Sequence, residues 1–373
     1  MTSSAPSGPG SGARRPTQAD VAKHAGVSVG IVSSVINDRQ YGNIRISDRT
    51  RLRVLDSIRE LGYSPNIAAR NLARGANKLL GVFSWQRLFP LLQEDFFYEF
   101  LVGIEEAAED SGYNLLMLCA AKDESGARSL FPTGANGLQL ADGGILLGWD
   151  EKVEQIRRLQ SENYPFVFVG ERRIDGVEAS WAGADYVDIT ASIVDRLAAL
   201  GHSTIGLITQ GVTPDEPVPG RRAGFAQGAA GNPRLVAHTA ALGGSADAAP
   251  TVLADEREVL RWLRETGVTG LVVESSGAAV AIREAAAAEG MSVPSDFSLV
   301  GLSGTPEVPG VADLTELSIP RREMGREAVA LLVRLLRDPA RTPLHTTLSC
   351  SLREAGTLDI PPARSGRPAG LDL

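Results

Sequence analysis

The chain has 373 residues, a length suited to two or three domains, and its 43% hydrophobic content allows a large packed core. Its formal net charge of −8, taken over the whole chain, argues against nucleic acid as a partner. The sequence contains no run of about 18 apolar residues, so it predicts no membrane-spanning helix.

The charge is unevenly distributed along the chain. Residues 14–78 carry 12 Lys and Arg against 5 Asp and Glu, a net charge of +7. The rest carries 25 Lys and Arg against 40 Asp and Glu, a net charge of −15. This split predicts a small basic module with a polyanionic partner, followed by a large acidic module.

Residues 1–15 form a predicted disordered tail, because the first 13 are rich in Ser, Gly and Pro. The tail lacks the basic start and apolar run of a secretion signal. Cys119 and Cys350 are far apart in the sequence and are interpreted as buried or free thiols in a reducing cytoplasm. We therefore expect a cytoplasmic protein.

Three short helices are predicted between residues 16 and 64. Thr17 is the expected N-cap of the first helix, and Gly26 supplies the left-handed residue that ends it. Ser28 caps a second helix, in which Val32, Val35 and Ile36 form an apolar stripe. The positions predicted to lie off this stripe are Val29, Gly30, Ser33, Ser34 and Asn37.

The third predicted helix begins after Ser47 and ends at Gly62. Its predicted inward side chains are Leu52, Leu55, Ile58 and Leu61, and its outer face carries Arg49, Arg51, Arg53 and Arg59. Such a module fits a helix-turn-helix that binds DNA. It equally fits a three-helix fragment with a solvated charged face, and composition and periodicity alone leave both open.

From residue 78 the pattern changes to short apolar runs that alternate with amphipathic helices, as in an α/β fold. Predicted strands include "LLGVFS", "GGILLG", "FVFVG", "TIGLIT", "GLVVE" and "SLVGLS". Predicted helices cover residues 97–111, 187–200, 221–229, 256–266 and 278–289, with another from 152. Two such series predict two lobes, each with a doubly wound parallel sheet, and a cleft between them.

The motifs "TQADVAKHAGVSVGIVSSVIN" and "ISDRTRLRVLDSIRELGYSPNIAARNLARG" closely resemble the head of the lactose-repressor (LacI) family of bacterial transcription regulators. Weaker similarity continues through "RRAGF", "SDFSLVGLSG" and "LREAGT". The resemblance implies a helix-turn-helix domain (16–64), a hinge helix and linker (65–77), and a bilobal periplasmic-binding-protein type I-like domain (78–357) that binds effector and dimerises. A tail (358–373) follows.

The resemblance implies DNA-binding roles by position, in which phosphate contacts orient the protein and base contacts specify the sequence. The implied contacts near the second helix are Thr17, Ser28, Val29, Gly30, Ser33, Ser34 and Asn37. Those implied to hold the DNA backbone are Ser47, Thr50, Tyr63 and Asn66. In the hinge, the implied contacts are Ala69, Arg70 and Leu72, and Leu72 matches the leucine that the family inserts between base pairs of the minor groove.

The second helix departs from the family pattern. Ile31 replaces a usual Thr, Ser34 replaces a usual Arg, and Gly30 stands where a longer polar residue is common. The helix therefore lacks the Arg that reads guanine through two hydrogen bonds. The loop at 38–46, longer than usual, brings Arg39, Tyr41, Asn43 and Arg45, either as substitute contacts or as a solvated surface.

The resemblance also implies an effector site. Arg221 holds the position of the family's cleft arginine, and Asp185 matches a family acid near the cleft. Ser276 and Ser303 stand where sugar-sensing members usually have aspartates, and Phe97 lies near the first helix of the domain. Because serine supplies no charge-assisted acceptor for a sugar diol, we expect an effector that is anionic, more apolar, or absent altogether.

Enzymatic signatures are missing from the sequence. The four histidines are scattered without metal-ligand spacing, and no phosphate-binding loop or nucleophile elbow appears. We expect no cofactor, no metal and no catalysis. The leading hypothesis is a homodimeric, operator-binding regulator; a small-molecule-binding protein without a regulatory role ranks second, and an α/β enzyme third.

Overall fold

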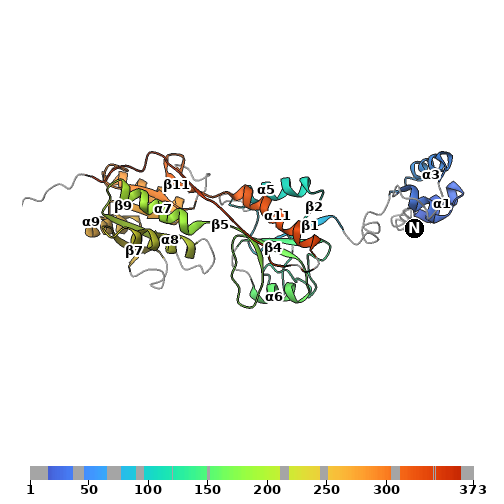
Figure 1. The fold of residues 1–373 in the computed structure, drawn as a ribbon, viewed down its shortest axis with the longest axis horizontal. Coiled ribbons are helices and arrows are strands. Elements are labelled where there is room, and N and C mark those ends of the chain that lie inside the picture. The colour runs from blue at the N-terminus through green and yellow to red at the C-terminus, as the bar shows by residue number, and fades with distance from the viewer. Residues whose placement is uncertain are drawn as a thin grey trace, which may run out of the picture. The chain divides into compact units, whose positions relative to one another are not determined.

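The computed structural model describes residues 16–36, 46–64, 77–89, 96–119, 121–148, 152–210, 218–243, 251–303, 311–338, 340 and 342–362. The chain divides into two compact units, Met1–Asn77 and Lys78–Leu373 (Figure 1). The described part of the first unit is helical, and the second contains two sheets.

The first unit, called the head below, packs three helices around a small apolar core. They are α1 (Gln18–Ala25), α2 (Val29–Ile36) and α3 (Asp48–Glu60), as predicted. Val21, Val32 and Val54 are fully buried at their junction. Gly26 has φ 62°, and this left-handed turn lets α2 leave α1 at a sharp angle.

The predicted inward face of α3 is wrong in its first half. Leu52 is 59% exposed and Leu55 is 38% exposed, whereas Val54 and Ser57 are buried. A stripe with a constant spacing of three residues drifts around a helix, and the observed core stripe instead combines spacings of three and four. Ser57 can be buried because its hydroxyl group is hydrogen-bonded: it donates to the Arg53 carbonyl and also bonds His24 Nδ1.

The N-terminal lobe of the second unit is built on a parallel sheet of order β12-β5-β4-β3-β1-β2. The strands are β1 (Leu79–Ser84), β2 (Asn114–Met117), β3 (Gly143–Leu147), β4 (Phe166–Val169), β5 (Ser180–Ala184) and β12 (His345–Leu348). Helices α5 (Tyr98–Asp110) and α11 (Arg321–Arg337) pack on one face. Helix α6 (Val153–Ser161) packs on the other.

The C-terminal lobe has a sheet of order β13-β11-β10-β9-β6-β7-β8, parallel except for β13. Its strands are β6 (Thr204–Thr209), β7 (Val236–Leu242), β8 (Val252–Leu253), β9 (Gly270–Val273), β10 (Ser298–Gly301), β11 (Thr315–Ser318) and β13 (Ser351–Arg353). Helices α7 (Tyr186–Ala199) and α8 (Val218–Gly231) cover one face; α9 (Glu256–Thr266) and α10 (Ser276–Ala288) cover the other.

The chain passes from one sheet to the other after β5, after β11 and after β12. Parallel sheets bind ligands beyond the carboxyl ends of their strands, which is where these connections lie. Packing continues past residue 357, the predicted end of the domain. Asp359 accepts a hydrogen bond from Ser298 through its carbonyl and donates one back to the Ser298 hydroxyl.

Among the described residues, no single helix is long and apolar enough to cross a bilayer; the head helices α1 and α2 reach that length only as a pair bent by 106°.

Candidate DNA-binding face and effector site

The head's helices begin at capped N-termini that the sequence predicted. The Thr17 hydroxyl accepts from the Asp20 backbone N–H, and the Asp20 carboxylate accepts from Thr17 in return. The Ser28 hydroxyl accepts from the Ile31 N–H at 3.4 Å. Ser47 caps α3, where its hydroxyl accepts from the Thr50 N–H and lies 2.9 Å from the Thr50 hydroxyl. Each cap fixes the start of a helix and orients its hydroxyl.

The outer face of α2 is small and uncharged. Val29 is 45% exposed, while Gly30 and Ser33 are partly exposed beside it. None of the eight residues of α2 is charged. Such a face allows close approach to a groove but offers no bidentate donor for a base.

Two predicted contact residues lie in the core of the head. Ser34 is 8% exposed, so the prediction that it lies off the buried face of α2 is wrong. The buried face of the helix includes Ser34 together with Val32 and Val35. Tyr63 is 9% exposed, with its ring in the head core. The predicted residues Asn37, Asn66, Ala69, Arg70 and Leu72, and the loop at 38–45, lie outside the described residues.

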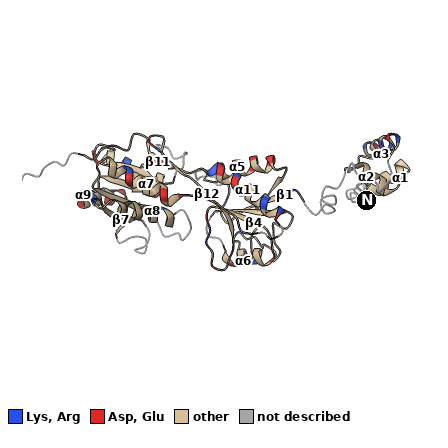
Figure 2. Ribbon diagram, viewed as in Figure 1, with Lys and Arg blue, Asp and Glu red and all other residues tan. Residues whose placement is uncertain are grey.

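Positive charge in the head gathers on α3 (Figure 2). Arg49, Arg53 and Arg59 are exposed there, and Arg51 is partly exposed. Arg59 forms a surface ion pair with Asp56 at 2.5 Å. Exposed arginines of this kind can supply the sequence-independent attraction to phosphates on which DNA binding depends.

In the second unit, the predicted effector residues Arg221, Ser276 and Ser303 meet at the carboxyl edge of the C-terminal sheet. Arg221, on α8, is 6% exposed, and its Nη1 lies 3.5 Å from the carbonyl of Glu274 at the end of β9. Ser276 opens α10, and its backbone N–H donates to the Ser303 hydroxyl at 2.7 Å. The two serines thus hold the ends of β9 and β10 together.

Two buried glutamates flank this edge, and the sequence did not single them out. Glu274 accepts from Arg222 Nε at 3.0 Å and from the Gln210 N–H at 2.9 Å. Glu316, on β11, accepts from the Ser276 hydroxyl at 2.9 Å and from Arg353 at 2.8 Å. Each carboxylate is thereby matched by an arginine and a neutral donor.

A second buried arginine, Arg321, was also missed. It is 6% exposed at the start of α11, and its Nη2 donates to the Ser303 carbonyl at 2.6 Å. Its guanidinium lies over the rings of Phe96 and Phe100, with centroids 5.2 Å and 6.0 Å away. An Arg that follows a Pro between a strand and a helix gives no sequence signal for this placement.

The remaining predicted effector residues border the same region. Asp185 caps α7, where its carboxylate accepts from the Asp188 N–H at 3.0 Å. The next residue, Tyr186, lies under the Arg221 guanidinium, 5.3 Å from the ring centroid. Phe97 is 3% exposed and packs edge-on against Phe96, so it is a core residue beside the site.

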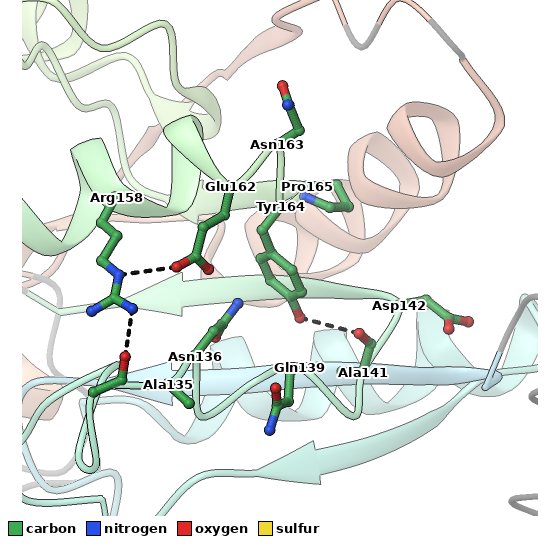
Figure 3. Close-up of a pocket in the computed structure, with 11 residues that line it drawn as sticks. Ala135, Asn136, Gln139, Ala141, Asp142, Arg158, Glu162, Asn163, Tyr164 and Pro165 are labelled. Carbon is green, nitrogen blue, oxygen red and sulfur yellow. Dashed lines mark hydrogen bonds and ion pairs between the residues drawn. The ribbon is translucent and has the colours of Figure 1, made fainter.

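The N-terminal lobe contains a hollow of about 590 Å³ at the opposite edge of its sheet (Figure 3). Its lining includes Asp142 and Pro165, which precede β3 and β4. Tyr164 donates to the Leu138 carbonyl at 2.9 Å, and Arg158 pairs with Glu162 at 2.9 Å. The hollow lies at the amino ends of the strands, and its Tyr164, Arg158 and Glu162 side chains are already engaged, so it does not resemble the effector site.

The histidines and cysteines of the described residues are candidates for metal ligands or disulfide partners. His202 is 3% exposed and bonds Thr269, Ser298 and the Asp359 carbonyl, so it is a packed residue of the C-terminal lobe. Cys119 is exposed and Cys350 is partly exposed, and neither forms a disulfide bond. Within the described residues, no group of three or more His, Cys, Asp and Glu could hold a metal ion.

Each of the two units matches a known protein family over part of its length. Residues 17–66 match the family "Bacterial regulatory proteins, lacI family", and residues 194–357 match "Periplasmic binding protein-like domain". The transcriptional regulator CelR of Thermobifida fusca is 28% identical over 92% of this chain and 99% of its own. The regulator AscG of Escherichia coli K12 is 26% identical over 86% of this chain and 92% of its own.

Solved structures share the fold. The lac repressor dimer bound to operator and the anti-inducer ONPF aligns with a TM-score of 0.69 at 22% identity, over 92% of this chain and 99% of that one. A CelR–cellobiose complex aligns with a TM-score of 0.59 at 24% identity, over 92% and 100% of the two chains. With a matching helix-turn-helix head, a matching bilobal domain and full-length relatives that are regulators, this chain belongs to the LacI family of bacterial regulatory proteins and is a DNA-binding transcription regulator.

Proposed function

We propose that this protein binds a near-palindromic operator as a homodimer, represses transcription, and changes its affinity for DNA when a small effector binds between the lobes. The observation that carries the proposal is the head, whose capped helices and basic α3 form a module that matches the family over residues 17–66. Because one head presents one α2, a two-fold dimer reads two half-sites.

Relatives support the proposal by what they bind. The lac repressor structure contains operator DNA, and the CelR structure contains cellobiose. In this chain, two serines and a buried arginine lie at the carboxyl ends of β9 and β10, the edge of an α/β sheet at which small ligands commonly bind, and this supports the proposal. We infer action in the cytoplasm, without catalysis, since DNA is the partner.

The proposal is tested by a gel shift on DNA upstream of the protein's own gene. We expect a discrete complex that excess random DNA does not remove and whose log affinity falls linearly with log salt, with a slope of about −0.9 per phosphate neutralised. Loss of the complex to an equal amount of random DNA would contradict the proposal. It would favour a small-molecule-binding protein without a regulatory role.

A further inference from the structure

The hollow of about 590 Å³ in the N-terminal lobe contains a buried side-chain amide with an unbonded donor. Asn136 is 7% exposed, and its side-chain oxygen accepts a hydrogen bond from the Leu138 N–H at 2.9 Å. Its amide nitrogen Nδ2, which carries two N–H donors, bonds no other group within the described residues. Because buried polar groups are almost always hydrogen-bonded, the acceptor for this nitrogen must come from solvent or from a ligand.

A carboxylate lines the same hollow without bonding this amide. In Figure 3, the Asn136 side chain lies between Glu162 and Tyr164, and no hydrogen bond joins it to either residue. One oxygen of Glu162 accepts from Arg158 Nε at 2.9 Å, and its other oxygen accepts no hydrogen bond from the described residues. The hollow therefore presents a donor and an acceptor that do not satisfy each other.

The walls of the hollow are held in place by the protein itself. Arg158 donates to the Gly134 carbonyl, and its guanidinium lies over the Phe131 ring, 4.1 Å from the centroid. Burial, and then the charge of Asp142, raise the pKa of Tyr164, so its hydroxyl stays protonated and keeps its bond to a backbone carbonyl. Arg158 and Tyr164 thus shape the hollow, and the groups left for a ligand are those of Asn136 and Glu162.

The hydrogen-bonding groups and the charges select a class of ligand. An anion cannot donate to the Glu162 carboxylate, and an ammonium group cannot accept from Asn136, whereas a hydroxyl group does both. The charged side chains of the lining are Asp142, Glu162 and Arg158, so its net charge is negative and disfavours anions. A neutral molecule with several hydroxyl groups meets both requirements.

We propose that this hollow is a second small-molecule site, which binds a neutral polyhydroxylated ligand of the size of a mono- or disaccharide. One hydroxyl of the ligand accepts from Asn136 Nδ2 and donates to the Glu162 carboxylate, and so reproduces the bonds that solvent makes there. The volume lies in the range of about 300–1,000 Å³ that is common for small-molecule sites. The site lies at the amino ends of β3 and β4, apart from the residues proposed to bind the effector, and goes beyond the proposed function.

The test is thermal unfolding of the full-length protein with glucose, cellobiose or myo-inositol, and with glucuronate as the anionic counterpart of glucose, at constant ionic strength. Sugars at high concentration stabilise proteins weakly without binding to a site, but this effect is shared by closely matched variants. The readout is therefore the rise in Tm of the wild type minus that of a variant. We expect at least one neutral compound to give a saturable difference of about 3 °C or more far above its Kd, and glucuronate to give none.

Two variants of the hollow assign this difference to the site. Asn136→Asp keeps the oxygen that accepts from Leu138 and replaces the free donor by an acceptor, so a purely structural asparagine would leave the sugar response unchanged. Glu162→Ala removes the acceptor at the cost of an exposed ion pair, which contributes little to stability. Both should lose the rise. The matched control is Glu154→Ala, which removes an exposed carboxylate paired with Arg157 on the same helix and should respond like the wild type.

Three results would overturn the inference. The first is an equal response of the wild type and both hollow variants to every neutral compound. The second is a response that Arg221→Gln loses and that Asn136→Asp and Glu162→Ala keep, because the sugar would then bind with the proposed effector residues. The third is a larger site-dependent rise with glucuronate than with glucose. Operator binding does not enter this comparison, so each of these results leaves the proposed function standing.

Discussion

Single glycines set how closely helices α5 and α11 approach in the N-terminal lobe. A Cβ on Gly103 would lie 1.9 Å from the carbonyl oxygen of Arg322, and one on Gly325 would lie 2.2 Å from that of Phe100. The Gly103→Ala variant must push the helices apart. We expect it to lower the free energy of unfolding by about 1–3 kcal/mol or more, measured by urea denaturation.

The matched control is Gly231→Ala at the end of α8, where an added Cβ meets nothing within 4 Å. This variant should be neutral or slightly more stable, because alanine favours helix over glycine. Equal effects of the two substitutions would contradict the close approach of α5 and α11.

The buried His202 couples stability to pH. Burial lowers its pKa below the usual 6.5, so the folded state resists protonation more than the unfolded state does. Its contribution is therefore fully present above pH 6.5 and is lost as the pH falls below that value. Urea denaturation at pH 7.5 and 5.5 should show a loss of stability in the wild type that is smaller in His202→Gln. An identical pH dependence in both proteins would show that His202 does not titrate as proposed.

At the scale of elements, hydrophobic pattern and caps predicted most helices and the central strands. Buried parallel strands such as β6 and β9 are continuous apolar runs, and α9 was predicted with its observed bounds, Glu256–Thr266. Strand β12 alternates partly buried and exposed residues, and β8 has two residues, so neither carries a strong local pattern. These edge strands depend on pairing with neighbours distant in sequence, as His345 opposite Trp181 illustrates.

The candidate site was predicted in part, for a similar reason. Arg221, Ser276 and Ser303 were predicted from motif positions, and the structure brings them to one sheet edge. Glu316 lies on β11, just before the chain crosses between the lobes for the second time, and Arg321 lies at the start of α11, just after that crossing. Both residues reach the site only through the tertiary fold. In the head, the local pattern placed Leu52 inside, whereas packing against α1 selected Val54.

Leu72, in the predicted hinge, is expected to contribute to the specificity of DNA binding. Since α2 has no charged side chain, we expect the insertion of Leu72 into the minor groove to supply much of the specificity. Leu72→Ser should weaken operator binding far more than binding to random DNA, because only the bent specific complex recovers the cost of unstacking. Anisotropy titrations on both duplexes measure this difference. Ser33→Ala, on the exposed face of α2, is the comparison and should cost less than about tenfold.

For the whole molecule, we expect a dimer and not a tetramer. The segment after "LREAGT" contains Pro and Gly without a heptad repeat, so its sequence predicts no coiled coil for joining two dimers. Sedimentation of the full chain without DNA should give a mass near 79 kDa, twice the chain mass of 39.4 kDa. A stable species of twice that mass in dilute solution would contradict this prediction.

In the proposed mode of binding, two heads of one dimer read a two-fold DNA site. The decisive test is selection of the full-length protein on random duplex DNA, followed by sequencing and by mass measurement of the complex on the recovered duplex. We predict a near-palindromic motif bound by two chains, with a half-site duplex bound much more weakly. Recovery of a single asymmetric motif bound by one chain, with equal affinity for its half, would contradict the claim.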